Sequence, residues 1–203
     1  MPRAEALLVI ASAIAGIVAA GATITPIANE PRVAHGESRS VRKTTAEQAP
    51  AAQLLGTLVQ THTDERVPLD AAQPSQERFA KLLADQVTGE HHDFEPRLLG
   101  LLRSIATQHL GARVELVSGF RSPKRNETMR KKGHHVASHS QHSLGHAVDF
   151  RIVPPDSARG LDPLVLEREI RNLGWDGGIG VYTLASDWFV HCDVGRLRRW
   201  NGG

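Results

Sequence analysis

The feature that most constrains this chain is an uncharged, apolar run near its N-terminus. The run extends from Ala6 to Ile24, directly after the charged residues Arg3 and Glu5. It is apolar on every face of a helix, whereas a buried core helix, which is the alternative, would show an amphipathic pattern. Its length lies between that of a cleavable signal peptide and that of a membrane-spanning helix. Residues 20–22 are small and could form a cleavage site. We therefore expect residues 1–24 to be a signal peptide or a membrane anchor.

Length and composition limit what the rest of the chain can be. With 203 residues, 40% hydrophobic and 23% charged, the chain has room for one catalytic domain. The net charge of +2 gives no strong positive field, and aromatic residues make up only 4%, so we expect no nucleic-acid partner. The single cysteine, Cys192, excludes a disulfide framework and a cysteine-rich zinc module.

The chain after the leader divides into two parts. Residues 25–76 mix Pro, Ala, Gln, Thr and scattered charges without a sustained period. This pattern is typical of a flexible spacer, and we expect no chemistry there. Regular periods begin near Phe79, so residues 77–203 are expected to form the functional domain.

Within this domain, helix-type and strand-type periods follow one another. We expect helices over residues 79–87, 96–110 and 162–173. We expect strands over residues 114–117, 146–153, 177–182 and 187–194, with the last two forming a hairpin. Because helices precede and interrupt the short strands, the sequence predicts an α+β fold with a small antiparallel sheet rather than a wound parallel sheet.

Five of the eleven histidines lie close together in the sequence: His134, His135, His139, His142 and His146. Asp149 follows in the expected strand, on the face opposite Val148 and Phe150. A carboxylate among such apolar residues is costly unless a cation or hydrogen-bond donors meet it. His142 precedes the strand on a turn where Gly145 lets the chain bend back, so His142 and Asp149 can converge on one metal ion.

A second histidine lies in the last expected strand. Alternation places His191 on the same face as Phe189 and Asp193, and Cys192 on the other face. Cys192 is therefore expected to pack as a small apolar residue, the alternative being a thiolate ligand or nucleophile. His142, Asp149 and His191 together would be the three-ligand set of a catalytic zinc. The alternative is a surface histidine cluster or a histidine-rich metal buffer that binds several ions weakly.

Several segments of the chain resemble a known family when they are taken together. They are 82–85, 88–90, 118–123, Asn126, 136–149, 177–182, 189–195 and Trp200. The family that they resemble is the murein endopeptidase K family of bacterial zinc peptidases, whose wider clan includes the D-Ala-D-Ala peptidases and the hedgehog fold. The segments extend from roughly residue 79 to residue 200, so the resemblance implies this zinc-peptidase fold for the whole expected domain.

The resemblance also implies roles for single residues. His142, Asp149 and His191 would be the zinc ligands, in agreement with the strand alternation. Arg121 would stabilise a developing oxyanion or hold a substrate carboxylate, unless it only pins a loop by binding carbonyl groups. Ser140 matches a position that contacts substrate in the wider clan, unless it only caps its turn.

The general base is where this chain departs from the clan. The clan has an acidic residue three positions before the last histidine ligand, and here that position is Trp188. Asp187 could replace it only if the strand began with a bulge or a turn, because four residues of straight strand span roughly 13 Å. Asp193 lies on the face of His191 and could be the base, or it could orient the metal-bound ring. A third possibility is that neither residue is the base.

The segment from Arg121 to Lys132 is strongly basic. It has one acidic residue, Glu127. Its six basic residues are Arg121, Lys124, Arg125, Arg130, Lys131 and Lys132. This basic stretch is either a solvated helix face or a surface that attracts a carboxylate-rich substrate.

Together these observations lead us to expect an exported zinc metallopeptidase that hydrolyses peptide cross-links of peptidoglycan. Its partners would be stem peptides and cross-links in the periplasm or cell envelope, with membrane contact only through residues 6–24. Two alternatives remain open. One is a D,D-carboxypeptidase or dipeptidase that trims stem peptides, and the other is a non-catalytic, zinc-stabilised module that binds the cell wall.

Overall fold

We describe a computed structural model of the chain, in which residues 52–132 and 139–202 are placed. All of them belong to one compact unit that spans residues 47–203. The expected leader, His134 and His135 lie outside the described residues. Among the described helices, none has the length and apolar character needed to cross a membrane.

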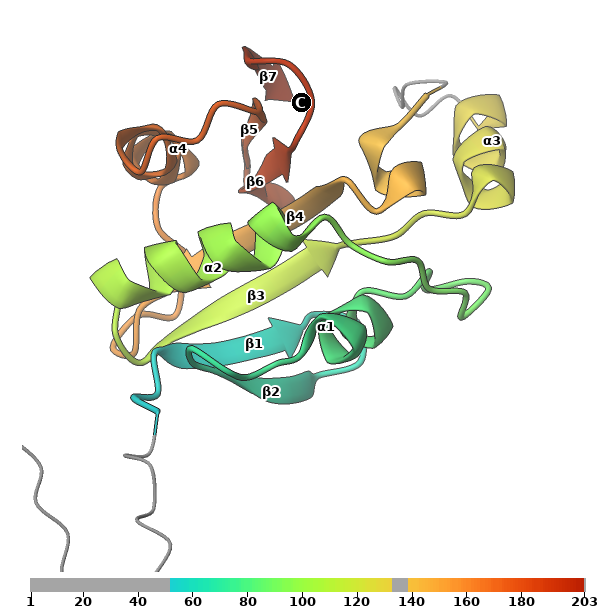
Figure 1. The fold of residues 1–203 in the computed structure, drawn as a ribbon. Helices are drawn as coiled ribbons and strands as arrows, with labels where there is room; N and C mark the ends of the chain where they lie inside the picture. Colours follow the sequence, from blue (N-terminus) through green and yellow to red (C-terminus); the bar gives the residue numbers. More distant parts are fainter. Residues whose placement is uncertain (1–51, 133–138, 203) are drawn as a thin grey trace, which may run out of the picture. The chain divides into compact units, whose positions relative to one another are not determined.

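One sheet of seven strands organises the domain (Figure 1). Its strand order is β2-β1-β3-β4-β6-β5-β7. Neighbouring strands are antiparallel, except that β1 pairs with β3 and β5 pairs with β7 in parallel. The strands are β1 (Gly56–Gln60), β2 (Glu65–Leu69), β3 (Ala112–Ser118), β4 (Ala147–Val153), β5 (Gly178–Leu184), β6 (Asp187–Asp193) and β7 (Arg198–Gly202). The predicted α+β class is confirmed, and the sheet is larger than expected and mixed.

The helices begin where the sequence gives start signals. They are α1 (Gln76–Leu82), α2 (Pro96–Gln108), α3 (Pro123–Lys131) and α4 (Pro163–Asn172), together with a short 3₁₀ turn, η1 (Gln141–Leu144). Ser75, Ser122 and Asp162 each accept a backbone N–H bond with their side chain at the start of α1, α3 and α4. The first helix is shorter than expected, since it ends at Leu82 and Val87 lies exposed in the following loop.

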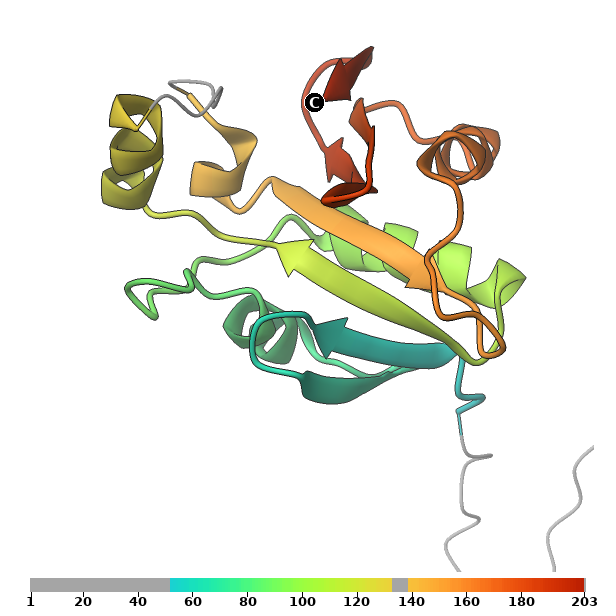
Figure 2. The same ribbon diagram turned by 180° about the vertical axis from the view of Figure 1, so that it is seen from behind.

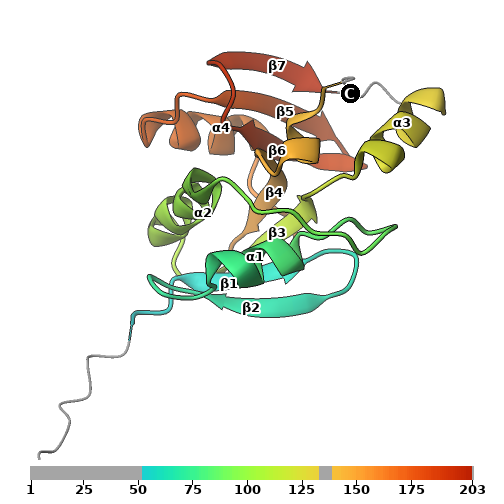
Figure 3. The same ribbon diagram turned by 45° about the vertical axis from the view of Figure 1, so that its right-hand side comes forward.

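The core lies between one face of the sheet and the helices. Helices α1 and α2 cover this face over β1, β3 and β4, and α4 packs against β5 and β6 (Figures 1 and 3). The apolar stripe of α2 meets the inward side chains of the central strands, all of them buried: Leu98, Leu102, Ile105, Val114, Leu116, Phe150 and Ile152. Seen from behind, β1, β3 and β4 lie in front of α2 (Figure 2). The polar residues of the central strands lie on this other face.

The boundary at residue 76 predicted for the spacer is wrong. Residues 56–69 form β1 and β2, with Leu58 and Leu69 fully buried in the core. Each strand has only five residues, and β2 contains Pro68, so neither shows a sustained local period. β1 is stabilised by pairing with β3, which follows about fifty residues later, and such a partner cannot be read from a local pattern. β7 was missed for the same reason, because its partner is β5.

Candidate metal centre

His142 is presented by the short turn η1, which ends at Gly145. Gly145 adopts the left-handed conformation with φ of 69°, and a side chain there would clash with the carbonyl oxygen of Asp93. The buried ring of His142 donates from Nδ1 to the carbonyl oxygen of Gly119 at 2.8 Å. This bond fixes the tautomer and leaves Nε2 as the free ligand atom.

Asp149 lies in β4, opposite an irregularity of β3. The register of β3 on β4 shifts between Leu116 and Ser118, so that Ser118 pairs with Asp149. The extra residue, Val117, forms a bulge of the kind that re-aims a strand next to a functional site. As expected from alternation, Val148 and Phe150 point into the core while Asp149 lies on the other face.

His191 is the third member of the group. It lies in β6 opposite Asp149 of β4 and Gly180 of β5. Cys192 points into the core and is fully buried, and burial raises the pKa of its thiol well above the ordinary value. Its predicted apolar role is therefore confirmed by its position.

The three potential ligand atoms form a tight triangle. His142 Nε2 lies 3.1 Å from His191 Nδ1 and 3.3 Å from Asp149 Oδ1, and His191 Nδ1 lies 2.7 Å from that same oxygen. In a tetrahedral zinc site with bonds of about 2.0–2.1 Å, two ligand atoms are roughly 3.3 Å apart. Among the described residues, these three therefore form a buried group that fits a metal ion with little adjustment.

The electrostatics of the group favour a positive charge at its centre. Burial alone would raise the pKa of Asp149, but the two histidines outweigh it and hold the pKa far below its usual range. Burial lowers the pKa of His142, so this ring is neutral, as a ligand must be. Burial also opposes the charged form of His191, yet its bonds to Asp149 and Asp193 raise its pKa to about 9. The two carboxylates thus stabilise a cation, either a proton or a metal ion, at His191.

Asp193 is placed to orient His191. It is fully buried, and its Oδ2 accepts from His191 Nε2 at 3.0 Å and from the guanidinium of Arg198 at 2.6 Å. Its Oδ1 accepts from Arg198 and from the N–H of Gly195, at 3.0 and 2.8 Å. Burial would raise the pKa of Asp193, but His191 and Arg198 lower it to about 2. With both oxygens engaged, the carboxylate matches the partner that fixes a metal-binding imidazole.

The register of β6 does not favour Asp187 as the base. β6 pairs with β5 in an unbroken register from Asp193 to Asp187, so the bulge that Asp187 requires is absent from this hairpin. Trp188 lies on the face opposite His191, where its Nε1 donates to the carbonyl of Gly160 and Arg159 stacks on its ring. An acidic residue at position 188 would therefore point away from the three ligands.

Comparison with known proteins now decides the family. The family model Peptidase_M15_2, described as peptidoglycan L,D-endopeptidase MepK, matches residues 59–200. The chain belongs to the MepK family. M15 peptidases are metallopeptidases, so a metal-binding group in this chain agrees with its family.

Individual MepK relatives support the assignment. The chain is 33% identical over 124 residues to a probable peptidoglycan L,D-endopeptidase MepK of Haemophilus influenzae, a match that spans 60% of this chain and 61% of the relative. It is 31% identical over 152 residues to peptidoglycan L,D-endopeptidase MepK of Escherichia coli K12, spanning 71% and 78%. The crystal structure of Serratia marcescens L-Ala D-Glu endopeptidase ChiX aligns with 50% of this chain and 80% of its own at 22% identity, with a TM-score of 0.36. The assignment does not depend on that alignment.

Arg121 and Ser140 flank the three ligands of this MepK-family chain. The N–H of Arg121 donates to the carbonyl of His142 at 3.2 Å, while its guanidinium makes no hydrogen bond or ion pair to the described residues. Burial lowers the pKa of Arg121, and the charge of Asp149 opposes this shift. Ser140 begins η1, but its side chain makes no capping bond. The capping and loop-pinning alternatives are thus not realised here, and substrate contact by both residues stays a prediction.

Sequence reasoning gave no role to three residues that build the site. Asp85 is buried and accepts from the N–H of Ser122 at 2.7 Å, which ties the loop after α1 to the start of α3. Trp200 of β7 packs over His191 with ring centroids 5.2 Å apart, and a Cβ at Gly180 would lie 2.6 Å from the indole. Arg198, on the same strand, holds Asp193. The alternation of Arg198 and Trp200 was a signal, but the strand is too short for it to stand out.

Proposed function

We propose that this chain is a zinc-dependent peptidoglycan endopeptidase that hydrolyses peptide cross-links, acting on L,D bonds as the names of its relatives state. The observation that carries the proposal is the buried group of His142, Asp149 and His191 in a chain of the MepK family. We further propose that the protein works in the periplasm or cell envelope, exported by residues 1–24 and held at the membrane by residues 6–24 if that segment is retained.

Each residue of the site has a task in this function. His142, Asp149 and His191 would hold the zinc ion, and Asp193 with Arg198 would keep the ring of His191 in place. A zinc ion held there would lower the pKa of a water molecule to about 7 and polarise the scissile carbonyl group. Arg121 would offer its permanently charged guanidinium, which is unpaired among the described residues, to the oxyanion or to a substrate carboxylate. Ser140 would contact the substrate through its uncommitted hydroxyl group.

The non-catalytic alternative loses its main argument. The absence of an acidic residue at position 188 would favour this alternative, but that position lies on the face away from the ligands. The trimming of stem peptides remains a distinct outcome, which differs from cross-link cleavage in its products.

The test is digestion of purified cross-linked peptidoglycan by the purified chain, with its zinc content measured in the same samples. We expect one tightly bound zinc per chain and a chelator-sensitive release of monomers from dimers cut at L,D bonds. The variant His142→Ala should lose both the zinc and the activity, while His135→Ala, a change in another histidine of the same sequence segment, should keep both. Tight zinc in His142→Ala would overturn the ligand assignment, and release only of terminal residues from monomers would identify a carboxypeptidase.

A further inference from the structure

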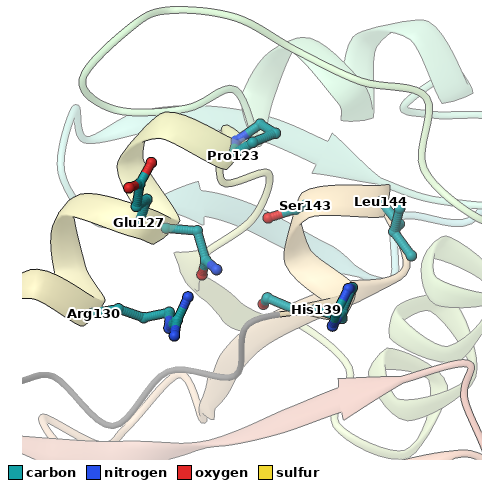
Figure 4. Close-up of a pocket in the computed structure, with 8 residues that line it drawn as sticks. Pro123, Glu127, Arg130, His139, Ser143 and Leu144 are labelled. Atoms are coloured by element: carbon teal, nitrogen blue, oxygen red, sulfur yellow. The ribbon is translucent and has the colours of Figure 1, made fainter.

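A cavity of about 370 Å³ lies beside the metal centre, between α3 and η1 (Figure 4). Its size lies within the range of cavities that bind small ligands. One wall comes from α3 and includes Glu127 and Arg130, and the other comes from η1 and includes Ser140 and Ser143. None of these residues except Ser140 has a task in the function proposed above.

Ser143 brings an unsatisfied polar group to the cavity. Its Oγ is buried and has no hydrogen-bond partner within residues 52–132 and 139–202. The hydroxyl points toward α3 across the cavity (Figure 4). Because buried hydroxyl groups are normally paired, this one offers an open hydrogen-bond position beside the cavity.

Arg130 brings an available positive charge. Figure 4 shows its guanidinium turned toward the cavity, and it makes no hydrogen bond or ion pair with the part of the chain that the structure describes. The one acidic residue of the same wall, Glu127, is held by Lys131 at 2.7 Å. A free guanidinium facing a hydroxyl donor is the arrangement that binds a carboxylate group.

The cavity is also in the right place for a substrate. Ser140 and Ser143 flank the ligand His142 in one turn, and α3 begins two residues after Arg121. A peptide whose scissile bond lies at the three ligands therefore brings its neighbouring residue close to this turn. Stem peptides of peptidoglycan carry free carboxylate groups, which match the charge of Arg130.

We propose that the cavity between α3 and η1 is a substrate subsite that binds a free carboxylate of the stem peptide next to the scissile bond. Arg130 is its cationic partner and Ser143 its hydrogen-bond donor. The subsite rests on the proposed function, because it specifies which substrates the endopeptidase prefers.

The test compares two cross-linked dimers, one with free stem-peptide carboxylates and one with these groups amidated. For Arg130→Gln we expect the KM for the free dimer to rise roughly tenfold, with kcat almost unchanged and no change for the amidated dimer. The matched control is Lys124→Gln, which removes one charge from the same helix but does not line the cavity. It should leave the KM for both dimers unchanged.

A second variant tests the hydrogen-bond donor. Ser143→Ala should raise the KM for the free dimer without lowering the Tm, since its hydroxyl has no partner among the described residues to lose.

Two kinetic results would overturn the subsite. One is an equal rise of KM for both dimers in Arg130→Gln, and the other is an equal effect of Lys124→Gln, which would indicate only general attraction by the basic stretch. If the wild-type chain cleaves neither dimer, the proposed function fails, and calorimetry with free and amidated stem tripeptides then decides on the subsite. Binding of the free tripeptide that is lost in Arg130→Gln supports it, whereas no binding, or equal binding by both proteins, rejects it.

Discussion

Neighbouring residues of β6 have opposite roles because a strand alternates its faces. His191 and Asp193 lie on the polar face, and Cys192 between them is part of the core. The two carboxylates that bind His191 act on different nitrogens, with Asp149 at Nδ1 and Asp193 at Nε2. Asp149 can therefore bind the same metal ion as His191, and Asp193 fixes the orientation of the His191 ring.

This assignment predicts how Asp193→Asn will behave. The variant should bind zinc about 10- to 100-fold more weakly, because the carboxylate that orients His191 is lost, and its activity should return at high zinc concentration. Zinc competition titrations and kcat/KM at several zinc concentrations would measure this. Asp187→Asn is the control and should behave as wild type. Full zinc affinity combined with lost hydrolysis in Asp193→Asn would instead make Asp193 the general base.

At the scale of elements, the regular hairpin of β5 and β6 decides which side chains reach the metal centre. Because this register is unbroken, Trp188 lies on the strand face opposite His191, where it contacts Gly160. The bulge that aims residues at the site lies in β3 instead.

Trp188→Glu would place an acidic residue at the position used by the wider clan. We expect no gain in activity, because the side chain points away from the ligands, and a loss of about 1–3 kcal/mol in the free energy of unfolding, because the contacts with Gly160 and Arg159 are lost. Urea denaturation and kcat measurements test both points. Trp188→Phe should lose less stability, and faster hydrolysis by Trp188→Glu would contradict the geometry.

The pairing of β1 with β2 and β3 predicts where the domain begins. A chain that starts at residue 77 lacks β1 and β2, removes Leu58 and Leu69 from the core and exposes the edge of β3. We expect it to be insoluble or unfolded, while a chain that starts at residue 52 should give a cooperative transition in circular dichroism. A folded 77–203 fragment would show that the first two strands are dispensable.

At the scale of the whole molecule, hydrogen bonds within the protein hold two of the three ligands in place. They join His142 to the carbonyl of Gly119 and His191 to the carboxylate of Asp193. The ligands come from η1, β4 and β6, which the rest of the sheet keeps in register.

Metal removal should therefore abolish activity without unfolding the protein. Zinc at a thousand times its dissociation constant stabilises a fold by about 4 kcal/mol, so we expect chelation to lower the Tm by roughly 10 °C while the circular dichroism spectrum at 25 °C stays the same. Calorimetry with and without chelator measures the shift. Loss of secondary structure on chelation would show that the metal builds the fold.

The sequence by itself determined the features that depend on short-range order. The starts of α2 and α4, the faces of β4 and β6, the apolar role of Cys192 and the convergence of His142 with Asp149 all follow from local periods and a glycine turn. The tertiary structure alone decided the features that depend on distant partners. Membership of β1 and β2 in the sheet, the pairing of β7 with β5 and the engagement of Asp193 by Arg198 are set by strand pairing. Pairing joins residues far apart in the chain, and no local pattern specifies which strands will meet.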